Sequence, residues 1–196
     1  MFTKKQQIIL LSILILFALL SIVFIFYFQN NTAILFFKKF DNGNLDCVTQ
    51  RQENIVQGTS LSGAIEEGNT VTILHNYYKC NKIERDDIVA YEYSSQSDPI
   101  IKFIKAIPGD SFSLIQDEGG NYNIKVNNNI LKTTGGQPYS LSENKSKMLQ
   151  LFEKNYNGLV PENSYLLLGN KYNGSVDSTQ FGLIDQSGII GKVAVD

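Results

Sequence analysis

The sequence predicts a mainly β protein, in which an antiparallel β-sheet domain follows one N-terminal transmembrane helix. Two observations predict this fold class. A long uncharged apolar stretch lies near the N-terminus. After Phe40 the chain changes to short runs of β-branched and aromatic residues that are separated by Gly, Asn, Asp and Pro.

The apolar stretch Ile8–Phe28 has the length of a membrane span. All but two of its 21 residues are hydrophobic, and no charged residue occurs from residue 6 to residue 37. A helix of this length, rising about 1.5 Å per residue, is about 31 Å long and matches a bilayer core. Because Gln29–Ala33 offers no small-x-small cleavage site, we expect a permanent anchor rather than a cleaved signal peptide.

The charges on the two sides of this stretch predict its orientation. Lys4 and Lys5 precede it and Lys38 and Lys39 follow it, so the positive-inside count is almost balanced. The tight N-terminal pair favours a cytoplasmic N-terminus. We therefore expect a short cytoplasmic N-terminus (1–7), a transmembrane helix (8–28), a membrane-proximal segment (29–54) and an extracytoplasmic β-rich domain (55–196).

Turn residues bound the segments that are expected to form this domain. Strands are expected at Thr70–Leu74, Asp87–Tyr93, Ile100–Ile107, Ser111–Gln116, Tyr122–Val126, Tyr165–Leu168 and Ile189–Val195. One helix is expected at Ser142–Lys154, where Met148, Leu151 and Phe152 recur at helical spacing. The chain length allows one ordinary domain after the anchor, and the sequence contains no internal repeat.

Charge and composition exclude several functions. All 19 acidic and 15 of the 17 basic residues follow Phe28, so this part has a net charge of −4 and no basic face for nucleic acid. One histidine and two cysteines exclude a histidine-rich metal centre and a four-thiolate zinc site. Cys47 and Cys80 fit either one disulfide or two separate thiols. His75, which follows a strand, is interpreted as part of a surface turn.

Three segments hold the candidate chemistry. Gly58–Asn69 is a polar loop that contains Ser60, and Gly169–Gly182 is a long hydrogen-bonding loop after a strand. Between them, Ile100–Asp110 places Lys102 among apolar residues, and burial there would lower its pKa towards that of a general base. A snorkelling lysine on an edge strand is the alternative. Alternation puts Lys102 on one strand face with Ile100, Ile104 and Ala106.

In these segments the sequence resembles the type I signal peptidase family, membrane-bound serine peptidases that use a Ser–Lys dyad. The family pattern Gly-x-Ser-Met-x-Pro-Thr-Leu-x-x-Gly-Asp aligns with Gly58–Asn69 without a gap. The patterns Lys-Arg-Val-x-Gly-x-Pro-Gly-Asp and Pro-Glu-x-x-Tyr-Phe-x-x-Gly-Asp-Asn-Arg-Asp-Asn-Ser-x-Asp-Ser-Arg-x-x-Gly align with Lys102–Asp110 and Pro161–Gly182. With Asp87–Val89 and Gly188–Val193, which resemble two further motifs, the likeness spans almost the whole domain.

The chain departs from the family pattern around the motifs. The departures are Leu61 for methionine, Gly63 for proline, Ala64 for threonine, Asn69 for aspartate, Phe103 for arginine, Asn170 for aspartate, Lys171 for asparagine and Thr179 for arginine. The salt bridges that frame the last loop in the family are therefore expected to be largely absent here.

The resemblance implies a role for each matching residue. Ser60 would be the nucleophile and Lys102 the general base, Ser175 would orient the lysine amine, and Asp177 would anchor the loop that holds Ser175. The Ser60 N–H, helped by the region of Gly58, would bind the oxyanion. Substrates would carry small residues at −1 and −3, in a pocket lined by Val56, Gln57, Ile100 and Ile101. Ser62 is the alternative nucleophile if the register is shifted, and Lys105 is the alternative base if the strand is bulged.

The expected function is that of signal peptidase I, a serine endopeptidase that cleaves signal sequences from exported preproteins at the outer face of the cell membrane. Its partners would be preproteins and the lipid bilayer, and no metal or other cofactor is expected. Two alternatives stay open. One is a non-catalytic signal-peptidase-like accessory or assembly protein, and the other is a specialised peptidase that matures a pilin or conjugation subunit.

Overall fold

The computed structural model describes Ser21 and residues 43–93 and 98–195. The expected transmembrane segment Ile8–Phe28 lies outside the described residues, apart from Ser21. No helix within the described ranges is long and apolar enough to cross a membrane. Asn44–Asp196 form one compact unit, which contains all of the candidate site residues named above.

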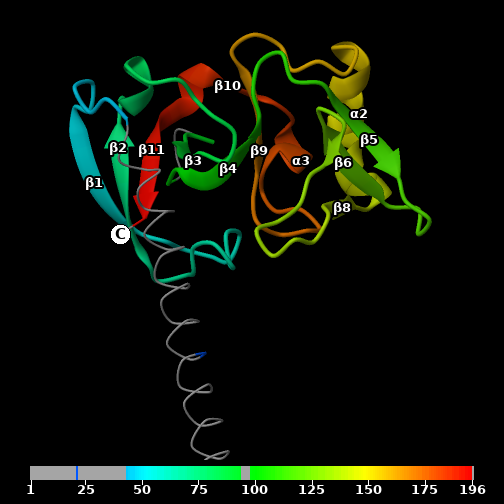
Figure 1. The fold of residues 1–196 in the computed structure, drawn as a ribbon, viewed down its shortest axis with the longest axis horizontal. Helices are drawn as coiled ribbons and strands as arrows, with labels where there is room; N and C mark the ends of the chain where they lie inside the picture. Colours follow the sequence, from blue (N-terminus) through cyan, green and yellow to red (C-terminus); the bar gives the residue numbers. More distant parts are fainter. Residues whose placement is uncertain (1–20, 22–42, 94–97, 196) are drawn as a thin grey trace, which may run out of the picture. The chain divides into compact units, whose positions relative to one another are not determined.

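Strands dominate this unit, in agreement with the expected mainly antiparallel β fold (Figure 1). The elements are β1 (Gln50–Ile55), β2 (Thr70–His75), η1 (Tyr77–Lys79), β3 (Ile88–Tyr91), β4 (Ile100–Ala106), β5 (Phe112–Gln116), β6 (Tyr122–Val126), β7 (Asn129–Ile130), β8 (Ser140–Leu141), α2 (Glu143–Asn155), β9 (Ser164–Leu168), α3 (Ser178–Phe181), β10 (Ile184–Asp185), η2 (Gln186–Gly188) and β11 (Ile189–Val195).

The strands form two antiparallel sheets. The larger has the order β1-β2-β11-β3-β4-β9-β10, so β11, the last strand in the chain, lies between β2 and β3. The smaller consists of β5, β6 and β7, with β8 paired to β6. In Figure 1 the smaller sheet and α2 lie on one side of β9, and the rest of the larger sheet lies on the other. The sequence predicted strands at Ser111–Gln116 and Tyr122–Val126, but not that they belong to a second sheet.

Apolar residues bury both faces of the larger sheet. One face packs Val71, Ile73 and Phe103 against Leu61 and Ile65 of the loop between β1 and β2. The other face packs Val89 and Ile104 with Leu167. A third cluster fills the space between the smaller sheet, α2 and β9. Because Leu61 and Ile65 are 2% and 1% exposed, the β1–β2 loop is fixed to the core at two points.

Strand β1 was not predicted from the sequence. It covers Gln50–Ile55, of which residues 50–54 belong to the segment expected to be membrane-proximal. Its six residues pair with β2, from Gln50 opposite His75 to Ile55 opposite Thr70. Strand β1 is polar because it is an edge strand whose side chains are exposed or half-buried. Its sequence therefore lacks the apolar alternation by which strands are recognised.

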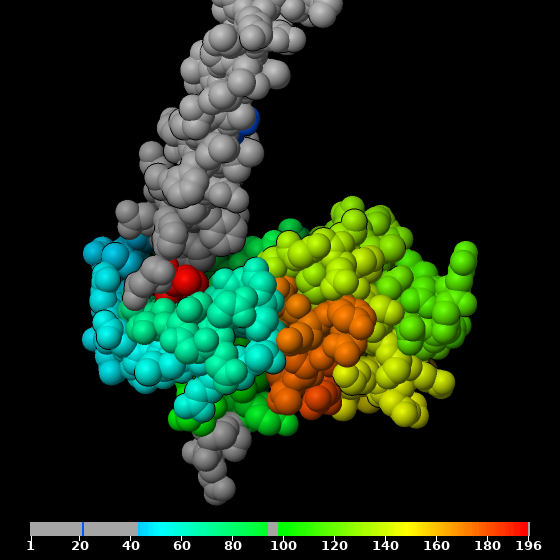
Figure 2. Space-filling view, turned by 90° about the horizontal axis from the view of Figure 1, so that it is seen from below, coloured from blue at the N-terminus to red at the C-terminus, as the bar shows by residue number. Residues whose placement is uncertain are grey.

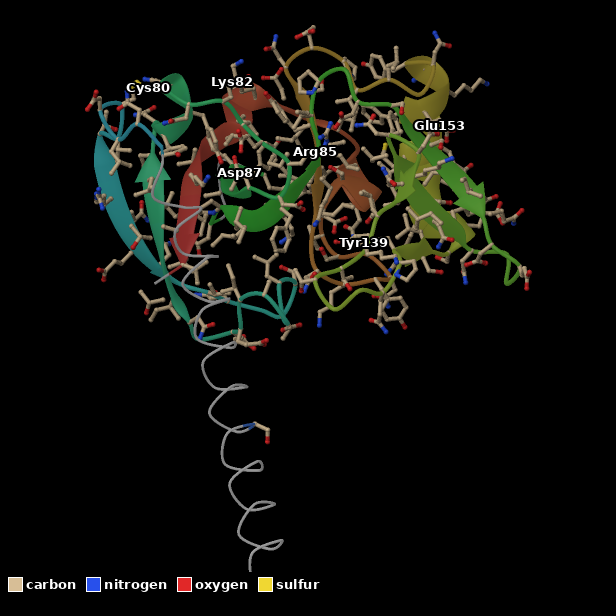
Figure 3. The ribbon with its side chains drawn as sticks, in the orientation of Figure 1. Cys80, Lys82, Arg85, Asp87, Tyr139 and Glu153 are labelled. Atoms are coloured by element: carbon tan, nitrogen blue, oxygen red, sulfur yellow. A yellow bond between two sulfur atoms is a disulfide. The ribbon has the colours of Figure 1, made fainter. Side chains whose placement is uncertain are left out.

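Cys47 and Cys80 are joined by a disulfide, with their Cα atoms 5.7 Å apart. This bond ties the segment before β1 to the residue after η1, where Figure 3 labels Cys80. The sequence indicated that the nearby His75 lies in a surface turn, but it does not. It is the last residue of β2, and its Nε2 lies 2.9 Å from Gln52 Oε1 on β1. The sequence interpretation was wrong because strand β2 continues one residue further than expected.

Candidate active site

The loop between β1 and β2 carries Ser60. A short turn shapes the loop: the Ser62 N–H donates to Thr59 O at 3.2 Å, and the Ile65 N–H donates to Leu61 O at 2.9 Å. Because Leu61 lies in the core, the backbone beside Ser60 has little freedom to move. This loop, residues 58–69, is called the nucleophile loop below, after the role expected of Ser60.

Lys102 lies in the middle of β4, opposite Val89 of β3, and is 4% exposed. The alternative of a snorkelling lysine on an edge strand is wrong, because β4 is flanked by β3 and β9. Its Nζ lies 2.8 Å from Ser60 Oγ and 2.8 Å from the carbonyl oxygen of Ile101. Two side chains 42 positions apart in the sequence thus meet across the core.

The structure only partly retains the strand face that was expected to hold Lys102 together with Ile100, Ile104 and Ala106. The β4–β9 register shifts between Ile104 and Ala106, which ends the alternation. Ile104 packs in one cluster with Val89, whereas Ala106 packs in the cluster under the smaller sheet.

Burial sets the acidity of the lysine. Removal of the ammonium from water lowers the pKa of Lys102 from 10.5 to about 8, and the negative charge of Asp177 opposes this shift. A substantial fraction of the side chain is therefore neutral in mildly alkaline solution. A neutral amine 2.8 Å from a hydroxyl can accept its proton.

Asp177 is fully buried, and neutral donors satisfy its carboxylate. Oδ1 accepts hydrogen bonds from the N–H and the hydroxyl of Thr179, at 3.0 and 2.7 Å. Oδ2 accepts from the N–H and the hydroxyl of Ser175, at 3.2 and 2.6 Å, and from the Gly169 N–H at 2.9 Å. Thr179, which replaces the arginine of the family pattern, thus supplies two hydrogen bonds in place of a salt bridge. Among the described residues no salt bridge involves this loop.

Two supporting residues have contacts that differ from the expectation. The Ser175 hydroxyl donates to Asp177, whereas the Lys102 amine donates to Ser60 and Ile101 among the described residues. Gly58, with φ of 79°, donates its N–H to Glu67 Oε1 at 3.0 Å. That N–H would therefore be free for an oxyanion only after Glu67 moves away.

The alternative candidates lie in different surroundings. Lys105 is almost as buried as Lys102, but its Nζ lies 2.6 Å from Asp86 Oδ1, in an ion pair. Ser62 contributes its carbonyl oxygen to a hydrogen bond from Asn170, 2.8 Å away. The structure thus brings Ser60, not Ser62, to the buried amine of Lys102.

A pocket of about 450 Å³ opens beside Ser60 and Lys102. The four residues expected in the pocket, Val56, Gln57, Ile100 and Ile101, all line it. The remaining lining residues are Glu53, Asn54, Ile55, Leu61, Ile73, Asp98 and Pro99. The β1 residues were missed because this strand was not recognised in the sequence. No cluster of potential metal ligands occurs within the part of the chain that the structure describes.

Asn170 and Tyr139 were not identified as site residues from the sequence. The Asn170 N–H donates to the carbonyl oxygen of Ser60 at 2.6 Å. The fully buried Tyr139, labelled in Figure 3, donates its hydroxyl to Gly169 O at 2.6 Å. The departure of Asn170 from the family's aspartate was the available signal, but its contacts depend on loops far away in the sequence.

Known proteins resemble this chain in sequence. The family described as "Signal peptidase, peptidase S26" matches residues 47–195. Signal peptidase IB of Staphylococcus aureus is 27% identical over 150 residues, which are 71% of this chain and 73% of that protein. A Staphylococcus aureus protein named "Inactive signal peptidase IA" is 24% identical over 142 residues, 72% of this chain and 76% of that protein. A crystal structure of a signal peptidase I from Enterococcus faecalis V583 is similar over 57% of this chain and 97% of that chain, with 22% identity and a TM-score of 0.36.

Proposed function

The chain belongs to the signal peptidase family, peptidase S26, and from this premise we propose that it is a serine endopeptidase that removes signal sequences from exported preproteins. Ser60 is the nucleophile and Lys102 the general base. One observation carries the proposal: the buried Lys102 Nζ lies 2.8 Å from Ser60 Oγ.

Acylation begins with the neutral amine. Lys102 Nζ takes the proton of the Ser60 hydroxyl while Oγ attacks the carbonyl carbon of the scissile peptide bond. The tetrahedral intermediate collapses as the C–N bond breaks, and the new amino terminus receives the proton from Lys102. The signal peptide stays bound to Ser60 as an ester.

In deacylation a water oxygen is the nucleophile and Ser60 Oγ is the leaving group. A water molecule gives a proton to the neutral Lys102 amine and attacks the ester carbonyl carbon. When the C–O bond to Ser60 breaks, Oγ takes the proton back and the signal peptide leaves with a free carboxyl group. Ser60 and Lys102 return to their starting states, and no cofactor takes part.

The Ser60 N–H is suited to stabilise the oxyanion. Among the described residues it has no hydrogen-bond partner, whereas the Gly58 N–H is engaged by Glu67. A backbone donor held beside the nucleophile needs no rearrangement as negative charge develops on the substrate oxygen. Ser175 and Asp177 act on the shape of the loop after β9, and Asp177 acts on the lysine also through its charge.

The substrate is an extended peptide with small side chains at −1 and −3. The mainly apolar walls formed by Val56, Ile100 and Ile101, together with Gln57, support a pocket for short side chains next to Ser60. The apolar stretch Ile8–Phe28 holds the enzyme at the membrane with the β domain on the extracytoplasmic side. Substrate and enzyme in the same plane meet at a raised effective concentration. The disulfide fits an oxidising compartment outside the cytoplasm.

A non-catalytic accessory protein is the second candidate, and two observations favour it. One relative is named an inactive signal peptidase, and several motif positions of this chain depart from the family pattern. The contact between Ser60 and Lys102 favours catalysis instead. A specialised peptidase for a pilin or conjugation subunit would use the same two residues on fewer substrates.

Cleavage of a model preprotein in detergent micelles tests the proposal. The full-length wild type is compared with Ser60→Ala and Lys102→Ala, which are expected to cleave no measurable substrate. Ser62→Ala, a matched substitution two residues away that keeps the Ser62 carbonyl, is expected to retain activity. Full activity of Ser60→Ala or Lys102→Ala would refute the dyad, and an inactive wild type would favour the accessory function.

A further inference from the structure

Asn170 uses its side-chain amide and its backbone N–H to bind two loops that are distant in the sequence. It is 8% exposed and lies just after β9. Its Nδ2 donates to Ser62 O at 2.8 Å and to Thr134 Oγ1 at 2.7 Å, and its Oδ1 accepts from the Thr134 N–H at 2.9 Å. Its backbone N–H donates to Ser60 O. One residue thus joins the nucleophile loop to the hairpin that contains Thr134.

Gly63 provides the space for this amide. Its φ is 88°, and a Cβ at this position would lie 3.1 Å from Asn170 Nδ2. Proline, the residue of the family pattern here, holds φ near −65° and cannot adopt this backbone. Gly63 and Asn170, both departures from the pattern, therefore fit each other as a pair.

The hairpin that contains Thr134 belongs to the smaller sheet. It turns at Thr133–Gly136, where the Gly136 N–H donates to Thr133 O at 2.9 Å, and it leads from β7 to β8. The Thr134 hydroxyl also donates to Gly63 O at 3.3 Å. In Figure 2 the teal surface of the nucleophile loop adjoins the orange surface of the loop after β9. Three separate chain segments therefore meet beside Ser60.

We propose that the side chains of Asn170 and Thr134 clamp the nucleophile loop and thereby position Ser60 against Lys102. The inference rests on the proposed peptidase function and adds two positioning residues to it, neither of which touches the substrate. The amide group is required, because a carboxylate at residue 170 would direct an oxygen at Ser62 O and would lose the donors that Nδ2 supplies.

The test compares side-chain variants in the full chain in detergent micelles. Asn170→Ala and Asn170→Asp remove the amide donors but keep the backbone bond to Ser60 O. Thr134→Val removes the hydroxyl, and Thr134→Ser restores it. Asn173→Asp, an exposed substitution in the loop after β9, and Gln137→Ala, an exposed substitution in the hairpin, are the matched controls. Since Thr134 is exposed, its variants are expected to fold even if those of Asn170 do not.

Hydrogen exchange of the loop amides is the readout that needs no substrate. In Asn170→Ala, Asn170→Asp and Thr134→Val, the N–H groups of Ser62, Ala64 and Ile65 are expected to exchange roughly tenfold faster, while those of β11 keep their wild-type rates. In cleavage assays kcat is expected to fall roughly 10- to 100-fold with KM within about twofold, because Ser60 is misplaced but the pocket is intact. Thr134→Ser is expected to restore both.

The two readouts separate the clamp from the peptidase function. Unchanged exchange of the loop amides in all three variants would overturn the clamp, and so would faster exchange with a wild-type kcat. If the exchange rates respond as expected but the wild type cleaves no preprotein, the clamp of the loop stands and the proposed function fails.

Discussion

Replacing Lys102 by methionine is expected to change how the stability of the protein depends on pH. Burial lowers the pKa of Lys102 from 10.5 to about 8. At pH 7 the folded protein therefore holds a buried ammonium that the unfolded chain holds in water. One pKa unit corresponds to about 1.36 kcal/mol, so this charge lowers the free energy of unfolding at pH 7 by about 3 kcal/mol.

The sign follows from proton binding. Between pH 8 and pH 10.5 the unfolded chain binds more protons at this lysine than the folded one, so wild-type stability rises with pH through that window. Methionine has a similar length and no charge, but it leaves Ile101 O and Ser60 Oγ without the lysine hydrogen bonds. Each lost bond costs about 1 kcal/mol. The variant is expected to be about 1 kcal/mol more stable than the wild type at pH 7 and about 1 kcal/mol less stable at pH 10.

Urea unfolding of both proteins at pH 7, 8, 9 and 10 in the same detergent measures this crossover. Lys82→Met, which removes an exposed positive charge, is the control and is expected to change stability by less than about 0.5 kcal/mol at pH 7. If the wild type and Lys102→Met had unfolding free energies that differed by a constant amount from pH 7 to pH 10, the argument from the buried ammonium would be refuted.

Three further predictions concern activity and stability. The kcat/KM of the wild type on a model preprotein is expected to rise about tenfold per pH unit below pH 8 and to level off above it, because in the proposed mechanism only neutral Lys102 accepts the Ser60 proton. An ascending limb centred at 10.5 would contradict this. Thr179→Val removes the 2.7 Å hydrogen bond to the buried Asp177 and is expected to lower the unfolding free energy by about 1–3 kcal/mol, measured by urea unfolding beside exposed Gln180→Ala as the control. Cys47→Ser with Cys80→Ser is expected to lower the unfolding free energy by about 2–4 kcal/mol; a double variant as stable as the wild type under non-reducing conditions would exclude a stabilising role of the disulfide.

The sequence predicted the strands that carry apolar alternation and missed those that do not. The expected strands Tyr122–Val126 and Ile189–Val195 coincide with β6 and β11, and the expected helix Ser142–Lys154 lies within one residue of α2 at either end. β1 was missed because its residues are polar at an exposed edge. The two-residue strands β7, β8 and β10 are too short to show a period, and tertiary pairing alone defines them.

The sequence predicted the site residues whose type the proposed chemistry requires. It did not predict the contacts between loops that are distant in the sequence. A buried lysine and a serine in a family motif identified Lys102 and Ser60 as candidates, and the structure places them in contact. The contacts of Asn170 could not be predicted, because its partners Ser62 and Thr134 lie 108 and 36 positions away and come together only through the fold. The same holds for Asp177, whose neutral donors depend on the conformation of one loop.

The central position of β11 determines when during biosynthesis the site can exist. Ser60 lies in the loop between β1 and β2, and Lys102 lies on β4, which pairs with β3. Within the larger sheet, β11 joins the β1–β2 pair to the β3–β4 pair. A nascent chain that has emerged only as far as residue 188 contains Ser60 and Lys102 but lacks β11, which lies between β2 and β3. Ser60 and Lys102 are therefore expected to meet only after β11 has inserted between β2 and β3.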